Sequence, residues 1–268
     1  NKVLEFRRNF RWTTNFTYSW NKNEIIELAA NAVNPVTGEA LNLTKLDIKG
    51  LGKAKYILKE GGTLGDLYTT SNLRFNDNGY VEVDKNGNLL MTDEGEDIYL
   101  GSVFPNHNLA WRNDFSYKGI NLGVLFTARL GGVCYSATQA NLDLYGVSEA
   151  SAAARDAGGV LINGREMVDA QKWYQAIGSQ SGLPQYYLYS ATNVRLQELS
   201  LGYTFPRKWF RNKLGLTVSF VGRNLWMIYC KAPFDPEAVA STGLNYQGID
   251  YFMMPSMRNL GFNVQFQF

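Results

Sequence analysis

The chain has almost no histidine or cysteine. Its 268 residues include one histidine, His107, and two cysteines, Cys134 and Cys230, which do not have the spacing of a metal site. His107 has no histidine or cysteine partner nearby, so we expect a strand-end residue rather than a ligand. Two cysteines are too few for a disulfide-stapled scaffold. They leave two alternatives, a single disulfide or two unpaired thiols.

Long apolar runs, strong net charge and catalytic motifs are also missing. No run approaches the roughly 18 apolar residues of a membrane-spanning helix, although this test does not detect membrane-spanning strands. The formal net charge is +2, so no basic footprint indicates nucleic-acid binding. Nucleophile elbows, phosphate loops and zinc-binding patterns are absent. We therefore expect no enzyme activity, no metal and no cofactor.

Aromatic residues and glycine are abundant, whereas proline is scarce. Aromatic side chains make up 14% of the chain, and there are 26 Gly but only 7 Pro, a composition that favours many strands and turns. The last nine residues alternate apolar and polar, and the apolar face holds Leu260, Phe262, Val264, Phe266 and Phe268. We interpret this apolar face as one that contacts lipid, because membrane barrels are apolar outside and polar inside. The alternative is the last strand of a soluble sandwich.

The same alternation recurs along the chain. Residues 10–20 begin and end in aromatic residues, and their length is close to the 9–11 residues that a tilted strand needs to cross a bilayer. Further segments lie at 106–117, 119–130, 193–205, 214–229 and 257–268. The parity predicts lipid-facing side chains at Phe16, Leu122, Phe126, Phe262 and Val264. It predicts lumen-lining side chains at Arg112, Asp114, Arg129 and Arg223.

Within 193–205 the apolar parity changes between Leu196 and Leu199. This shift predicts a β-bulge or the exit of the strand from the membrane.

The connections between these segments alternate in length. Those at 118–119 and 206–213 are short, and those at 131–192 and 230–256 are long. Outer-membrane barrels have short periplasmic turns and long external loops, an asymmetry for which a soluble sandwich has no reason. The predicted fold is therefore all-β, an antiparallel transmembrane β-barrel segment of about seven strands with long external loops. A secreted all-β binding or adhesion module is the alternative.

The long connections have patterns of their own. Residues 149–157 and 166–177 look helical, and the second segment has Met167, Trp173, Tyr174 and Ile177 at helical spacing. The two aromatic residues, Trp173 and Tyr174, are candidates for substrate or partner contact, with local packing as the alternative. Turn signals around residues 80–83 predict a hairpin within 72–97, and a weakly patterned strand is expected around residues 55–68.

Asp235-Pro-Glu237 presents two carboxylates from a connection that proline residues stiffen. One interpretation is a contact to substrate or partner through Asp235 and Glu237. The other is a loop anchor in which Asp235 binds neighbouring backbone amides.

Several motifs together resemble a known family. Arg195-Leu-Gln-Glu-Leu-Ser-Leu-Gly-Tyr-Thr-Phe-Pro206, Gly222-Arg-Asn-Leu-Trp226, Pro233-Phe-Asp-Pro-Glu237, Gly248-Ile-Asp-Tyr251 and the terminal Phe268 resemble the C-terminal end of SusC/RagA-type TonB-dependent outer-membrane transporters. Phe115-Ser-Tyr-Lys-Gly119 resembles the preceding hairpin of that family. The likeness extends over nearly the whole chain.

The resemblance implies a barrel of about 22 strands with an N-terminal plug. Residues 1–268 would form the C-terminal portion of that barrel, with the plug domain and the N-terminal strands outside this chain. It also implies energy from the TonB complex, a SusD-like surface lipoprotein as partner, and an oligosaccharide or oligopeptide as cargo. The location would be the outer membrane of a Gram-negative bacterium, surrounded by lipid, with the C-terminus in the periplasm. The terminal strand would carry the assembly signal, at Phe262, Val264, Phe266 and Phe268.

Overall fold

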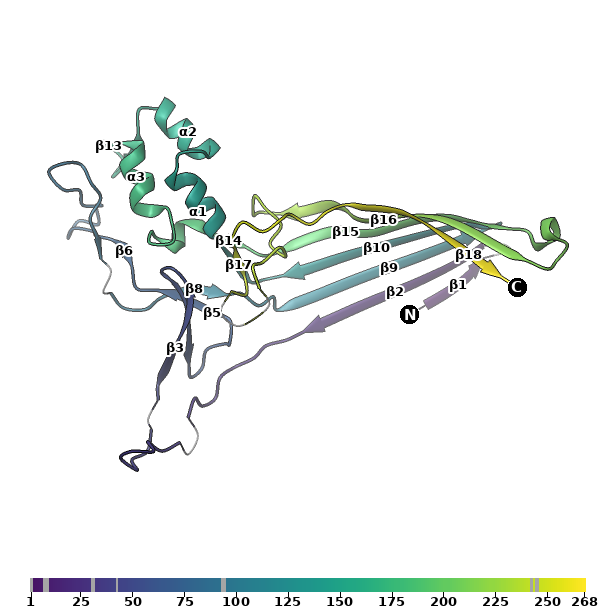
Figure 1. The fold of residues 1–268 in the computed structure, drawn as a ribbon, viewed down its shortest axis with the longest axis horizontal. Coiled ribbons are helices and arrows are strands. Elements are labelled where there is room, and N and C mark those ends of the chain that lie inside the picture. The colour runs from purple at the N-terminus through teal and green to yellow at the C-terminus, as the bar shows by residue number, and fades with distance from the viewer. Residues whose placement is uncertain are drawn as a thin grey trace.

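The chain folds into one long antiparallel sheet with a group of smaller elements at one end of it (Figure 1). The structure is a computed structural model that describes residues 2–6, 10–29, 32–41, 43–92, 95–241, 243 and 246–268. The long sheet has seven strands in the order β1-β2-β9-β10-β15-β16-β18. These are β1 (Lys2–Phe6), β2 (Phe10–Trp20), β9 (His107–Tyr117), β10 (Ile120–Leu130), β15 (Asn193–Phe205), β16 (Gly215–Cys230) and β18 (Asn259–Gln267).

The smaller elements, here called the loop group, lie in the three connections β2–β9, β10–β15 and β16–β18. One sheet has the order β3-β4-β5-β8 and another the order β14-β11-β17, and two pairs complete the strands. The strands are β3 (Lys45–Leu51), β4 (Ala54–Lys59), β5 (Asp66–Thr69), β6 (Asn72–Leu73), β7 (Met91–Thr92), β8 (Ile98–Ser102), β11 (Val133–Ser136), β12 (Val160–Ile162), β13 (Glu166–Val168), β14 (Leu188–Ser190) and β17 (Ile249–Asp250). The helices are α1 (Ala137–Leu144), α2 (Glu149–Asp156), α3 (Ala170–Ile177) and the short 3-10 helix η1 (Pro184–Tyr187), while a second 3-10 helix, η2 (Arg207–Phe210), belongs to the β15–β16 turn.

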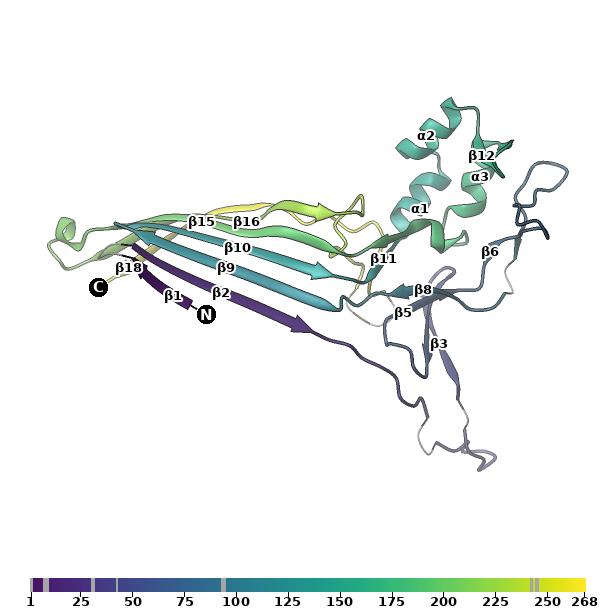
Figure 2. The ribbon, with the colours of Figure 1, turned by 180° about the vertical axis from the view of Figure 1, so that it is seen from behind.

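The alternation of short and long connections is confirmed in three dimensions. The β9–β10 turn at Lys118 and Gly119 and the β15–β16 turn containing η2 lie at one end of the sheet, where β18 also ends (Figure 1). Lys118 and Gly119 both have positive φ, which closes the two-residue turn. The loop group gathers at the opposite end, as the view from behind shows (Figure 2).

The register of the long sheet aligns the apolar residues of successive strands into continuous rows. One row runs across six strands through Trp12, Phe115, Leu122, Leu201, Phe220 and Phe262. A second row runs across five strands through Phe16, Trp111, Phe126, Leu196 and Trp226. Large members of these rows are exposed, among them Phe262 at 80% and Trp226 at 60%. The sheet therefore presents one wide apolar face that no other described part of the chain covers.

A β-bulge explains the change of parity in β15. Leu125 of β10 pairs with Glu198, whereas the next residue, Phe126, pairs with Leu196, so Gln197 has no partner in β10. The extra residue returns Leu196 to the same face as Leu199. Of the two explanations that the sequence offered for the parity change, the β-bulge is the one that the register shows.

The packed core lies in the loop group rather than in the long sheet. Tyr56, Leu67, Tyr135, Leu183 and Ile249 are fully buried, and they come from β4, β5, β11, the residue before η1, and β17. Among the described residues, no helix has the length and apolar character that crossing a membrane would require.

Some details of the loop group differ from the sequence prediction. The predicted helix 166–177 begins only at Ala170, because residues 166–168 form β13 and pair with β12. The side chain of Asp169 caps the helix by accepting a hydrogen bond from the backbone amide of Lys172. The helix 149–157 is confirmed as α2, whereas α1 was not predicted. The strand expected around 55–68 is two strands, β4 and β5.

Three further local features bear on the sequence analysis. Bridges from Phe75 to Val81 and from Val83 to Leu89 form the turns expected within 72–97. His107 begins β9 and shares a hydrogen bond with the Tyr18 hydroxyl. Cys134 and Cys230 are free thiols, and burial raises the pKa of Cys134 to about 12.

Candidate functional site

A charged network crosses the polar face of the long sheet. Arg112 on β9 binds Asp114 with two hydrogen bonds, of 2.9 and 3.0 Å, and reaches Glu198 on β15 at 3.2 Å. Arg223 on β16 binds the other oxygen of Glu198 at 3.0 Å. The predicted lumen residues Arg112, Asp114 and Arg223 thus meet in one network, and Glu198 is the carboxylate that joins them.

The network has to pass over β10, and Gly123 makes the passage possible. Gly123 lies between Asp114 and Ser200 in the register. A Cβ atom at this position would lie 2.5 Å from the Ser200 hydroxyl and 3.0 Å from a carboxylate oxygen of Asp114. These distances are shorter than ordinary contacts, so the side chains of the network occupy the space that glycine leaves.

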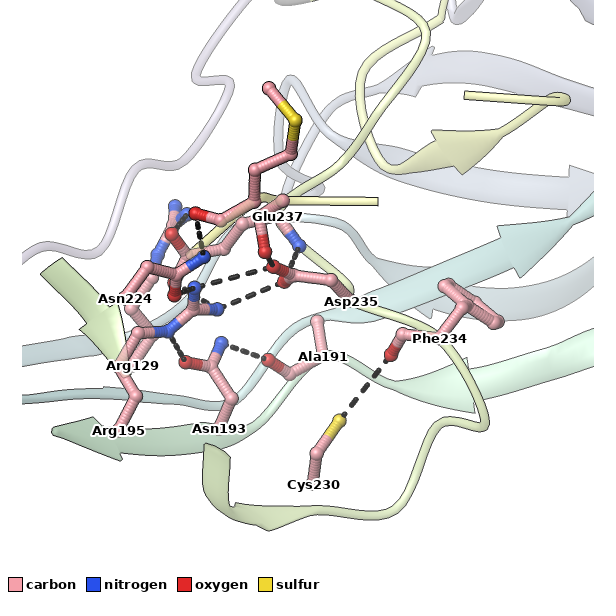
Figure 3. Close-up of polar contacts among 11 residues, drawn as sticks. Arg129, Ala191, Asn193, Arg195, Asn224, Cys230, Phe234, Asp235 and Glu237 are labelled. Atoms are coloured by element: carbon pink, nitrogen blue, oxygen red, sulfur yellow. Dashed lines mark hydrogen bonds and ion pairs between the residues drawn. The ribbon is translucent and has the colours of Figure 1, made fainter. Parts of the chain in front are cut away.

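A second polar cluster lies where β15 and β16 meet the loop group, and Arg195 is at its centre (Figure 3). Its guanidinium donates to Asp235 at 2.9 and 3.3 Å, and it also binds Glu237 at 3.2 Å. The side chains of Asn193 and Asn224 accept two further hydrogen bonds from it, at 3.2 and 3.3 Å. Arg195 therefore ties the strands to the connection that follows β16.

Asp235 faces inward, toward Arg195 (Figure 3). Its side chain is 7% exposed and that of Arg195 is 5% exposed. Asp235 also accepts hydrogen bonds from the Ser256 hydroxyl and, at 3.0 Å, from the Glu237 amide. Burial acts to raise the pKa of Asp235, but the hydrogen bonds from Arg195 and Ser256 outweigh it and hold that pKa below its ordinary value. The structure therefore shows the internal anchoring that the sequence offered as one of two interpretations.

Glu237 is more open than Asp235, and it borders a small cavity. One of its oxygens lies 3.2 Å from Arg195 and the other 3.9 Å from Arg129, whose side chain is 42% exposed. The cavity, of about 140 Å³, lies beside them. Its wall includes Val103, Phe104, Pro105, Arg129, Val133, Ala191, Pro236, Glu237, Val239 and Gln247. The structure thus brings Arg129, a predicted lumen residue, together with Glu237, a predicted contact residue.

Trp173 and Tyr174 lie on α3, away from this cavity. Both pack against the core of the loop group, and the ring of Trp173 meets the Tyr186 ring edge to face at 5.8 Å. The terminal strand β18 lies at the edge of the long sheet, where Phe262 contacts Phe220 at a ring distance of 5.6 Å. Phe262, Val264 and Phe266 share the apolar face, and Phe268 follows the strand.

Sequence reasoning missed three central residues of these clusters, Arg195, Glu198 and Asn224. Arg195 and Glu198 have opposite parity in the sequence, and only the bulge at Gln197 brings both to the polar face. Asn224 has a positive φ of 53°, in a break of the β15–β16 register. Charge balance was an available signal for Glu198, because the arginines on the polar face need carboxylate partners.

The comparisons with known proteins come from sequence and from structure. No family model matches the chain. Over 304 residues, 99% of the chain, it is 25% identical to TonB-dependent receptor P3 of Formosa agariphila. The chain matches part of a TonB-dependent receptor. TonB-dependent receptor P39 of the same organism is 21% identical over 96% of the chain. The chain spans about 28% of the length of these curated relatives.

Solved structures give the same result for the fold. The structure of the RagAB peptide transporter matches 98% of the chain with a TM-score of 0.57 and 19% identity, over 28% of that protein. The RagAB peptide importer in its open-open state matches with a TM-score of 0.58 and 16% identity. The resemblance to SusC/RagA-type TonB-dependent receptors is confirmed for the part of their length that the chain spans.

Proposed function

We propose that residues 1–268 form the C-terminal portion of the barrel of a TonB-dependent importer, which carries a nutrient across the outer membrane of a Gram-negative bacterium. The observation that carries this proposal is the wide, exposed apolar face of the long sheet opposite a polar, charged face. Barrel strands have this arrangement, with lipid outside and a wet lumen inside.

The complete barrel would have about 22 strands around a plug, as the family resemblance implies. In that barrel Arg112, Asp114, Arg129 and Arg223 would line the lumen, and the loop group would face the outside of the cell. The C-terminus would lie in the periplasm with the short turns. A SusD-like surface lipoprotein would dock on the loop group, and TonB would act through the plug. The cargo would be an oligopeptide or an oligosaccharide.

The cavity between Arg129 and Glu237 is the place in the described chain where we propose contact with cargo or partner. Both side chains are partly exposed and carry opposite charges, and their ion pair, at 3.9 Å, is long. Asp235 would support the contact indirectly, because it holds Arg195 beside Glu237. Trp173 and Tyr174, on α3, would contact the cargo or the partner with the part of their side chains that is not packed against the core.

A growth experiment tests the import function. Cells that lack the gene of the full-length receptor are compared with complemented cells on two nutrient pools, a casein digest and a mixture of glucan oligosaccharides. We expect the deletion to abolish growth on one pool and complementation to restore it, in a manner that requires TonB. Unchanged growth of the deletion strain on both pools would contradict import of either class.

A single variant tests the contact at the cavity. Glu237→Gln keeps the size of the side chain but removes its charge, so uptake per folded receptor should fall while the amount of receptor in the membrane stays near normal. Lys208→Gln, in the turn at the opposite end of the sheet, is the control for a loss of charge. Equal uptake per receptor in both variants would show that Glu237 does not contact the cargo.

A further inference from the structure

The three α-helices of the loop group, α1, α2 and α3, border a cavity of about 200 Å³ that shares no lining residue with the clusters around Arg195 and Arg112. It is bordered by the end of α1, by one face of α2 and by the start of α3. Its lining residues are Asp143, Leu144, Tyr145, Gly146, Ser151, Arg155, Ala170, Gln171 and Tyr174.

Asp143 is the unusual member of this wall. It is 5% exposed, it accepts a hydrogen bond from the Gln139 side-chain amide at 3.0 Å, and the buried Tyr187 hydroxyl interacts with it as well. Within the part of the chain that the structure describes, neither lysine nor arginine lies within ion-pair distance of it. A buried carboxylate without a cation is costly, because burial removes its water and neutral hydrogen-bond donors replace the lost solvation only in part. Asp143 therefore presents an unbalanced negative charge to the cavity.

The surroundings of Asp143 add to this negative character. The carboxyl end of α1 lies there, and the partial negative charge of a helix end favours a bound cation. Two tyrosines, Tyr145 and Tyr174, are among the lining residues, and aromatic faces attract ammonium groups. The neighbouring Tyr187 responds to the same carboxylate, since burial, then the charge of Asp143 and a hydrogen bond to it, raise the pKa of Tyr187.

Arg155 is the one cation of the wall, and it does not neutralise Asp143. Its guanidinium donates to the Gly146 carbonyl at 2.8 Å, and its side chain is exposed to solvent. Arg155 therefore lies close enough to weaken the binding of a cation without replacing it.

We propose that this cavity binds a primary ammonium group carried on a short alkyl chain, with Asp143 as its counter-ion and Tyr145 and Tyr174 as its aromatic walls. A metal ion fits less well, because the described residues contain no group of three or more side chains able to hold one. The ammonium could come from a free amine or from a lysine side chain in a peptide. Tyr174 is also a proposed contact residue of the importer, but the ammonium site depends on Asp143 and does not require the import function.

Isothermal titration of the full-length receptor in an uncharged detergent tests the site. The probes are cadaverine, a free diamine, and lysine blocked at both backbone ends, with 1-pentanol as the neutral ligand. We expect saturable binding of cadaverine or of blocked lysine and none of pentanol. Binding of cadaverine assigns the site to free amines, and binding of blocked lysine alone assigns it to lysine within a peptide.

Four variants make the test specific. Asp143→Asn still accepts the hydrogen bond from Gln139, and it should weaken ammonium binding at least tenfold. Asp156→Asn, an exposed acid on α2, should leave binding unchanged. Tyr174→Leu should weaken binding, whereas Arg155→Ala should tighten it, because the competing cation is gone. Absence of saturable binding by both amines, or equal binding by the Asp143→Asn and Asp156→Asn proteins, would overturn the proposal.

Discussion

The guanidinium of Arg195 is buried together with the carboxylate of Asp235. Removing either side chain therefore leaves the other as an unpaired buried charge. We predict that Arg195→Ala destabilises the attachment of the β16–β18 connection by about 3–5 kcal/mol, because Asp235 is left buried and unpaired. Arg129→Ala is the matched control. Its ion pair to Glu237 is longer and partly exposed, so its loss should cost only about 0–1 kcal/mol.

Limited proteolysis of the folded, full-length receptor measures this difference. Cleavage within the β16–β18 connection should be much faster in the Arg195→Ala protein than in wild type, and near wild type in the Arg129→Ala protein. Similar cleavage rates in the two variants would refute the anchoring role of Arg195.

The ion pair between Arg195 and Asp235 also predicts that the stability of the β16–β18 connection depends on pH. Although burial acts to raise the pKa of Asp235, its hydrogen bonds lower it below the ordinary 3.8. The ionised carboxylate therefore contributes stability that is fully present above the unfolded pKa and is lost as the pH falls through the lower folded pKa. Pepsin cleavage of the β16–β18 connection should accelerate below about pH 3.8 in wild type. In the Asp235→Asn protein, pepsin should cleave this connection readily at higher pH as well. If the cleavage rate of that variant depended on pH as it does in wild type, Asp235 would be ruled out as the titrating group.

At the scale of the secondary-structure elements, the charged network can cross β10 because position 123 is glycine and has no side chain. We predict that Gly123→Ala lowers the stability of the sheet by about 1–3 kcal/mol, since the added Cβ forces the network apart. Gly261→Ala in β18 is the control, because a Cβ there meets no atom within 4 Å. The urea concentration at which the barrel loses its heat-resistant mobility on gels reports the difference. Equal midpoints in the two variants would show that the network does not need the glycine.

The terminal strand supplies a second prediction at this scale. Phe262, Val264 and Phe266 lie on the apolar face of β18, and Phe268 follows the strand. Replacing Phe266 and Phe268 with Asp should reduce the amount of folded receptor in the outer membrane, because charge on a lipid-facing strand opposes insertion. The matched change of Asn263 and Gln265 to Asp, on the polar face, should have little effect. Immunoblots of outer-membrane fractions measure both, and equal abundance would contradict a role for the terminal aromatic residues.

Six of the seven strands of the long sheet were predictable, because the apolar side chains of a half-buried strand repeat every two residues. The short strand β1 was not predicted. Helix α1 lacked an equally visible apolar stripe, since its buried side chains include two small alanines, Ala137 and Ala140. A capping signal was nevertheless present. Ser136 caps the helix, and Gln139 stands three residues later, the spacing of a capping box.

The ion pairs could be predicted only in part. Parity identified Arg112, Asp114, Arg129 and Arg223 as one face, and the register places them there. Which carboxylate each arginine meets depends on register across strands that are far apart in sequence, such as β9 and β15. The pairing of Arg195 with Asp235 also depends on the path of the connection after β16, for which no sequence period exists.

For the whole molecule, the distribution of apolar side chains separates two environments. The loop group buries its own core, as a water-soluble structure does, whereas the long sheet leaves its aromatic rows exposed. A soluble sandwich would cover such a face with a second sheet, and none of the described elements does so. This distribution supports the proposed barrel segment, with water around the loop group and lipid along the apolar face of the sheet.

Spin labels on the full-length receptor in liposomes test this separation most directly. Single labels are placed at Phe126 and Arg129, three residues apart on β10 and on opposite faces. We predict that the label at 126 is reached by oxygen, which concentrates in lipid, and that the label at 129 is reached by a water-soluble nickel complex. Phe16 and Phe262 should behave like Phe126, and Arg223 like Arg129. Water exposure at position 126 together with lipid exposure at position 129 would contradict the account.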